Sequence, residues 1–154
     1  MKRYNLFLLF LSIVFTNCSK NELQVCNYDW IEGFAIQIDE LDLEYQKIYL
    51  NNNSKDCDSL AKKIFHDYSK KFIQHIADDF VWEEVVKCHV KIYFSKNGKA
   101  EYFIYKFDEL KNQLDDDSLK LFERLSIEFI KKNPLEIHKD KPYSLSTYIF
   151  LRNI

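Results

Sequence analysis

The chain is poor in the two residues that build stiff arms and phosphate-binding loops. It has only two prolines and two glycines among 154 residues. Two prolines cannot form a long proline-rich arm, and two isolated glycines cannot form a Gly-rich phosphate loop. The 22 basic and 24 acidic residues leave a net charge of −2, and no basic stripe suggests nucleic acid. These absences argue against a spacer protein, a P-loop enzyme and a nucleic-acid-binding protein.

Long hydrophobic runs are also scarce, and the clearest one lies near the amino end. Apolar residues dominate from Leu6 to Phe15, a few residues after Lys2 and Arg3. This run is too short to cross a bilayer, which takes about 20 residues, but it suits the hydrophobic region of a secretory signal peptide. We therefore predict that residues 1–17 are a signal peptide. An uncleaved signal anchor is the alternative.

A cysteine follows this run in the stretch Phe15-Thr16-Asn17-Cys18. The stretch resembles a bacterial lipobox: Thr16 fits the small middle position, whereas Phe15 and Asn17 depart from the usual Leu and Gly or Ala. The resemblance implies a lipoprotein whose mature chain begins at an acylated Cys18. At about 0.8 kcal/mol per buried methylene, two or more acyl chains would hold it on a membrane. The implied location is the cell envelope, on a bacterial membrane, facing the periplasm or the cell surface.

Three further cysteines, Cys26, Cys57 and Cys88, remain in the mature chain. An oxidising envelope could support one disulfide among them. The favoured pair is Cys26 and Cys57, because both flank polar, turn-like segments. Free thiols throughout are the alternative.

The part before residue 58 gives weak structural signals. Residues 18–27 are polar and are predicted to be a tether, followed by one domain over 28–154. Apolar residues alternate within 30–38, which predicts a strand. Residues 39–50 fit both a helix and a strand, and we favour a helix.

A clear amphipathic helix is predicted to begin after Asp58, which suits an N-cap. Its apolar residues recur at helical spacing, and the helix is expected to run to about Ala77. The predicted buried stripe consists of Leu60, Ile64, Tyr68, Phe72 and Ile76.

The strongest local signal is a β-hairpin from Val86 to Phe107. Asn97-Gly98 is typical of a two-residue type I′ turn, which requires positive φ at both positions. With that turn, Val90 faces Tyr105, and the apolar residues of both strands share one surface. A slip by one residue would mix the two faces, so the pattern supports the register.

The remaining segment predicts a helix and a last strand. Asp115–Asp117 can cap the helix, its buried stripe is Leu119, Phe122, Leu125 with Ser126 and Phe129, and Asn133-Pro134 ends it. Tyr143–Leu151 is rich in β-forming residues. The predicted fold is therefore α+β: an antiparallel β-hairpin, an amphipathic helix and a final antiparallel strand, with the preceding helix packed on the sheet.

This order resembles the TonB carboxyl-terminal domain over about residues 86–154. The likeness rests on Val90–Phe94, the Asn97-Gly98 turn, the helix opening Leu114-Asp115 and the last strand Tyr148–Leu151. The family's Trp-x-Pro after the helix is absent, and Asn133-Pro134-Leu135 stands in its place. The resemblance implies a related binding fold without the energy transducer's task, because the chain lacks that protein's proline-rich arm.

In that family, an exposed edge strand near the carboxyl end can pair with an extended peptide of a partner. The resemblance therefore implies a protein or peptide partner for this chain, bound by edge-strand addition. Tyr143, Tyr148 and Phe150 on the last strand are the candidate partner-binding residues. Packing of these rings on the preceding helix is the alternative.

No pattern brings catalytic or metal-binding side chains together. His66 and His75 share a helix of about 3.6 residues per turn, which places them on opposite sides. Cys88 and His89 are neighbours on a strand, where successive side chains point to opposite faces. We therefore predict a non-enzymatic protein with no catalytic residues, metal or cofactor. Two other functions stay open: an immunity-type lipoprotein that neutralises a periplasmic toxin, and a hydrolase with dispersed residues.

Overall fold

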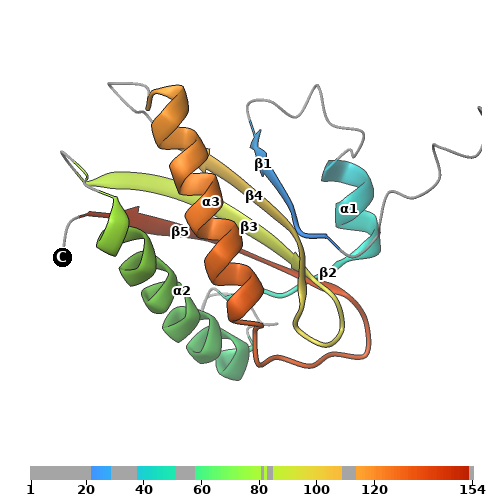
Figure 1. The fold of residues 1–154 in the computed structure, drawn as a ribbon. Helices are drawn as coiled ribbons and strands as arrows, with labels where there is room; N and C mark the ends of the chain where they lie inside the picture. The colour runs from blue at the N-terminus through green and yellow to red at the C-terminus, as the bar shows by residue number, and fades with distance from the viewer. Residues whose placement is uncertain are drawn as a thin grey trace, which may run out of the picture.

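The computed structural model describes residues 22–28, 38–50, 58–80, 82, 85–108 and 114–152. Five strands of this part form one sheet in the order β1-β4-β3-β5-β2 (Figure 1). The elements along the chain are β1 Gln24–Asn27, α1 Ile38–Glu44, β2 Gln46–Lys47, α2 Ser59–Asp79, β3 Val86–Phe94, β4 Ala100–Phe107, α3 Asp116–Lys132 and β5 Tyr143–Leu151. The predicted α+β class is confirmed.

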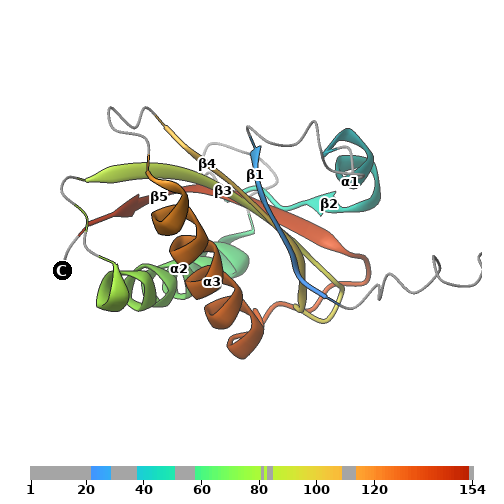
Figure 2. The ribbon, with the colours of Figure 1, turned by 45° about the horizontal axis from the view of Figure 1, so that its top comes forward.

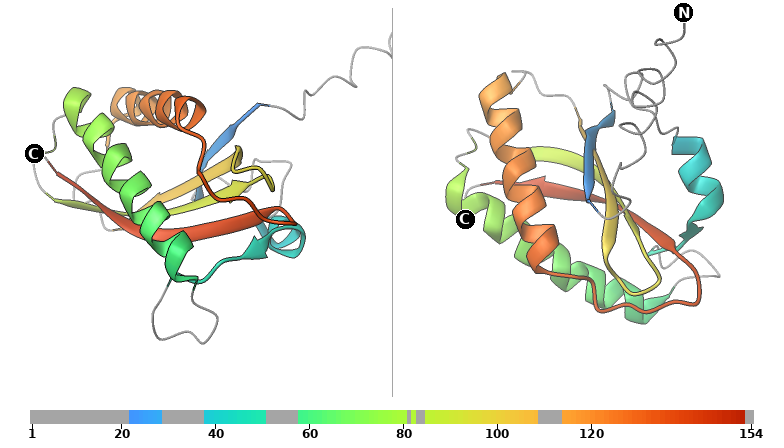
Figure 3. Two further views of the ribbon diagram at one scale, coloured as in Figure 1. Left: turned by 90° about the horizontal axis from the view of Figure 1, so that it is seen from below. Right: turned by 45° about the vertical axis from the view of Figure 1, so that its right-hand side comes forward.

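The helices lie on both faces of the sheet. α2 and α3 pack side by side against one face, and α1 lies on the other (Figures 2 and 3). The large core between α2, α3 and the sheet is rich in aromatic rings, such as Phe72 of α2, which contacts both Phe103 and Phe129. Edge-to-face contacts of this kind stabilise a core beyond its buried area.

The hairpin register is confirmed. Val90 pairs with Tyr105, and Ile92 pairs with Phe103, in the antiparallel ladder of β3 and β4. β5 pairs with β3 on its other side, also antiparallel, from Val86–Leu151 to Phe94–Tyr143. β3 is therefore the central strand, and its alternate side chains are buried under α2 and α3 as the apolar pattern predicts.

The hairpin loop differs from the prediction. The Ser95 N–H donates to the Lys99 carbonyl at 2.8 Å, and the Gly98 N–H donates to the Ser95 carbonyl at 3.0 Å. Gly98 has a φ of 80°. This is a turn followed by a left-handed glycine, and the ladder shifts between Tyr93 and Phe94. The predicted two-residue type I′ turn is wrong, because the loop takes one residue more.

Besides its positive φ, a close backbone contact requires a glycine at position 98. A Cβ atom on it would lie 1.8 Å from the backbone oxygen of Leu135. The Leu135 N–H donates to the Gly98 carbonyl at 3.0 Å, so the segment between α3 and β5 is hydrogen-bonded to the hairpin tip. The segment Asn133-Pro134-Leu135 thus docks the hairpin loop.

The start of α2 is confirmed, but its buried face is shifted from the prediction. An Asp58 side-chain oxygen accepts the Ala61 N–H at 2.9 Å as the N-cap. Leu60 is 67 % exposed, whereas the buried residues of α2 are Ala61, Phe65, Tyr68, Phe72 and Ile76. Steps of four residues drift around a helix of 3.6 residues per turn. The prediction placed Leu60 in the stripe because it used only such steps.

α3 follows the prediction closely. Asp115 caps its start by accepting the Ser118 N–H at 2.7 Å, and Asn133 ends it by donating its N–H to the Phe129 carbonyl. Phe122, Leu125, Ser126, Phe129 and Ile130 are buried. Leu119, predicted to share this stripe, is only partly buried because it lies close to the helix end.

The amino-terminal part contains the main corrections. Gln24–Asn27 form β1, parallel to β4, so the predicted tether is wrong over these residues. Cys18 and residues 1–17 lie outside the described residues. The strand predicted over 30–38 also falls outside them, except that Ile38 begins α1. Residues 39–50 combine both alternatives: α1 ends at Glu44, and β2 follows it.

Candidate functional site

The two edges of β5 differ in their pairing. Its inner edge pairs with β3 along the whole strand. Its outer edge pairs with β2 only at Tyr143 and Ser144, where the Ile48 N–H also donates to the Ser144 carbonyl at 3.0 Å. Within the described ranges, no backbone group pairs with this edge from Ser146 to Leu151. Among the described residues, the Ser146–Leu151 part of β5 therefore has an open outer edge.

The peptide groups at this open edge can be assigned. The Ser144 carbonyl points to the outer edge, because it accepts the Ile48 N–H. Backbone groups alternate between the two edges along a strand. The N–H and C=O groups of Ser146, Tyr148 and Phe150 therefore also point outward, available to another strand.

Two aromatic side chains flank the open edge on the face away from α2. Tyr148 is 49 % exposed and Phe150 is 53 % exposed. The Lys87 Nζ lies 3.8 Å from the centroid of the Tyr148 ring and 2.8 Å from the Asp108 carboxylate. A cation over a ring face is attracted by the ring quadrupole, so Lys87 holds Tyr148 in place.

His89 supports the same surface. Its ring lies 5.0 Å from the Tyr148 ring, centroid to centroid, and its Nε2 lies 2.7 Å from the Ser146 Oγ. Burial lowers the pKa of His89, and the Lys91 and Lys87 charges act in the same direction, although Asp108 opposes them. The imidazole therefore favours its neutral form.

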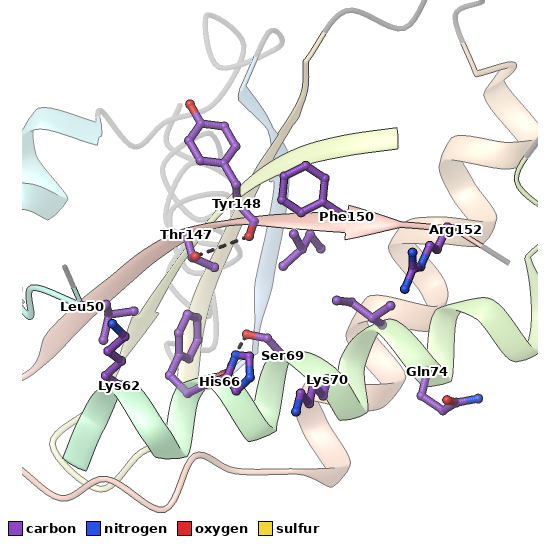
Figure 4. Close-up of a pocket in the computed structure, with 13 residues that line it drawn as sticks. Leu50, Lys62, His66, Ser69, Lys70, Gln74, Thr147, Tyr148, Phe150 and Arg152 are labelled. Carbon is purple, nitrogen blue, oxygen red and sulfur yellow. Dashed lines mark hydrogen bonds between the residues drawn. The ribbon is translucent and has the colours of Figure 1, made fainter. Parts of the chain in front are cut away.

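A groove runs along the other face of the open edge, between α2 and β5 (Figure 4). Its volume is about 760 Å³. Apolar side chains line its inner part, including Phe65, Ile73 and Ile149, and Figure 4 shows α2 across the groove from β5. The groove and the open edge therefore form one continuous surface.

The groove is basic although the chain as a whole is slightly acidic. Lys62, His66 and Lys70 line it from α2, and Arg152 lines it after β5. Among the described residues that line the groove there is no Asp or Glu. Sequence reasoning missed this basic row, although the spacing of Lys62, His66 and Lys70 by four residues was a sufficient signal for one helix face.

The predicted partner-binding residues do not lie on one face of the sheet. Tyr143 is fully buried: its ring stacks on Phe94, and its hydroxyl donates to the Ile137 carbonyl at 2.8 Å. Its prediction as a docking residue is therefore wrong, because its side chain points to the helix-covered face. Tyr148 and Phe150 point away from α2, as Figure 4 shows, and remain candidate partner-binding residues.

The cysteines give no reactive site among the described residues. Cys26 is a free, buried cysteine, and Cys57 lies outside the described ranges, so the disulfide between them stays a prediction. Burial, followed by the Glu123 carboxylate, raises the pKa of the Cys26 thiol. Burial also raises the pKa of Cys88, which is fully buried. Both thiols are therefore poor nucleophiles.

The two histidines of α2 have different surroundings. His66 lines the groove, whereas the His75 ring packs 5.6 Å from Phe129 of α3. Within the ranges that the structure describes, no group of three or more His, Cys, Asp or Glu residues could hold a metal ion. In the same ranges, no helix is long and apolar enough to cross a membrane.

Known proteins offer no guide to this surface. No protein-family model, curated protein or solved structure matches the chain. The resemblance to TonB carboxyl-terminal domains therefore stays a prediction, and a functional proposal depends on the open edge, the two exposed rings and the basic groove.

Proposed function

We propose that this protein is a non-enzymatic, lipid-anchored protein of the bacterial envelope that binds an extended peptide or protein segment. The segment adds as a strand to the outer edge of β5, next to Ser146, Tyr148 and Phe150. The observation that carries the proposal is the open edge itself, since in the part of the chain that the structure describes β2 pairs with β5 only at Tyr143 and Ser144. Unpaired edge groups of this kind are the recognition element in β-augmentation.

Two further features support the proposal. β5 is held rigidly by its ladder with β3, so its edge is fixed in space before a partner arrives. In addition, the hairpin, the helix and the last strand follow one another in an order that resembles TonB carboxyl-terminal domains, in which edge-strand addition occurs. The lipid anchor is proposed from residues 1–18 alone, and mass spectrometry of the mature amino terminus checks it: we expect acylated Cys18, and an intact Met1 would contradict it.

A proline substitution at the open edge tests the binding mode. The Tyr148 N–H points outward, so Tyr148→Pro removes a donor from the open edge without removing a bond to β3. Tyr148→Ala is the matched control, because it removes the same ring and keeps the N–H. Short random peptides displayed on phage are selected on the mature chain and then tested by fluorescence anisotropy on each variant.

We expect the selected peptides to lose binding to Tyr148→Pro and to bind Tyr148→Ala within about tenfold of the parent chain, since one ring contributes about 1–2 kcal/mol. Hydrogen exchange should show the amides of Ser146, Tyr148 and Phe150 protected in the complex. Equal binding to the proline and alanine variants would contradict strand addition.

A further inference from the structure

A strand added to β5 would present its side chains to two different surfaces. Successive side chains of a strand point to opposite faces. One set would lie beside Tyr148 and Phe150, on the face of the sheet away from α2. The other set would enter the groove between α2 and β5, beside Thr147 and Ile149.

From this arrangement we infer that the bound segment carries acidic side chains at alternate positions, facing α2. This inference rests on the proposed function and adds the chemistry of the partner to it. Lys70 and Arg152 line the groove together with Lys62 and His66, and there is no carboxylate among its described lining residues. Complementary charge of this kind selects partners and speeds their association.

The spacing of the basic residues matches an extended chain. Lys62, His66 and Lys70 follow one another every four residues along α2, which is about 6 Å per step. Alternate side chains of a strand lie about 6.8 Å apart. Since α2 faces β5 across the groove (Figure 4), acidic side chains of the bound strand that enter the groove would lie close to these basic residues.

The other face indicates what lies between the acidic positions. Tyr148 and Phe150 are half-exposed rings, which fit apolar side chains of the added strand. The favoured segment therefore alternates acidic and apolar residues. A nucleic acid or an anionic membrane could also meet the basic groups, but neither would pair with the backbone groups of Ser146, Tyr148 and Phe150.

Synthetic peptides test the inference on the mature chain. The first alternates Glu with Val, and two matched peptides carry Gln or Lys in place of Glu. Lys70→Glu reverses one charge in the groove. Lys71→Glu is its matched control, because Lys71 is exposed on the same helix and does not line the groove. Fluorescence anisotropy gives the affinities at low and high salt.

We expect the Glu peptide to bind more tightly than the Gln peptide by roughly fivefold per charge pair, and the Lys peptide to bind most weakly. Lys70→Glu should reduce the preference for Glu by roughly fivefold, and Lys71→Glu should leave it unchanged. High salt should narrow the difference between the Glu and Gln peptides, because exposed charges are screened.

The failure of this inference is distinguishable from failure of the proposed function. Equal affinity for the three peptides, all lost in Tyr148→Pro, would overturn the acidic preference and leave strand addition in place. Binding that Tyr148→Pro does not change would overturn both. Tighter binding of oligo(dT) or of vesicles containing phosphatidylglycerol than of the Glu peptide would also overturn the inference.

Discussion

The two halves of β5 have similar β-forming sequences and different surroundings. The closed half, Tyr143–Leu145, is buried and has β2 at its outer edge. The open half, Ser146–Leu151, has only β3 as a described neighbour strand. Among the described residues, what separates the paired part of the outer edge from the unpaired part is the length of β2, which ends at Lys47. A strand can thus be core at one end and available for a partner at the other.

The largest effect that separates the two halves should come from removing a ring. Tyr143→Ala would leave a cavity beside Phe94 and remove the bond to Ile137, so we expect the free energy of unfolding to fall by about 3–5 kcal/mol. Tyr148→Ala, in the open half, should lower it by less than about 1 kcal/mol. Urea unfolding of both variants measures the difference. Similar losses in the two variants would contradict the division of the strand.

The next effect concerns the segment that leads into the closed half. Gly98→Ala would place a methyl group against the Leu135 carbonyl and force a positive φ on a residue with a Cβ. Left-handed strain and overpacking together should lower the free energy of unfolding by about 3 kcal/mol. Asn97→Ala, at an exposed position of the same loop, is the control and should change it by less than about 1 kcal/mol. Thermal unfolding that is equal for both variants would show that the glycine is dispensable.

The smallest effect concerns pH and the open half. The native pKa of His89 lies below 6.5 because of burial, so the unfolded chain binds more protons below that pH. The free energy of unfolding should therefore fall as the pH drops below 6.5. His89→Gln keeps a partner for Ser146 and cannot titrate, so its stability should fall less between about pH 7 and pH 5. Parallel pH profiles for the parent chain and the variant would contradict this assignment.

The local signals in the sequence were sufficient for much of the fold. The hairpin register, the caps Asp58 and Asp115, and the bounds of β5 depend on nearby residues and on alternation, and the structure confirms them. The predicted length of the hairpin loop was wrong by one residue, because Asn-Gly also fits a turn followed by a left-handed glycine. Its tight contact with Leu135 depends on a distant segment and has no local signal.

The short strands and the groove were harder to predict from the sequence. β1 and β2 are parallel additions to the sheet, and they depend on partners far along the chain, so their few residues carry little periodicity. Tyr143 and Tyr148 lie on the same strand, yet an odd number of residues, five, separates them. Their side chains therefore point to opposite faces of the sheet. The groove requires α2 to lie beside β5, which neither element reveals alone.

The position of β1 has a mechanical consequence. β1 occupies one margin of the sheet and is held to β4 over only four residues, whereas β5 is held to β3 over nine. In a chain attached to a membrane through its amino end, tension on a segment captured at β5 crosses the sheet and leaves it through β1. The four-residue ladder of β1 then carries the whole load, so β1 would detach first and lengthen the tether while β5 stays paired with β3.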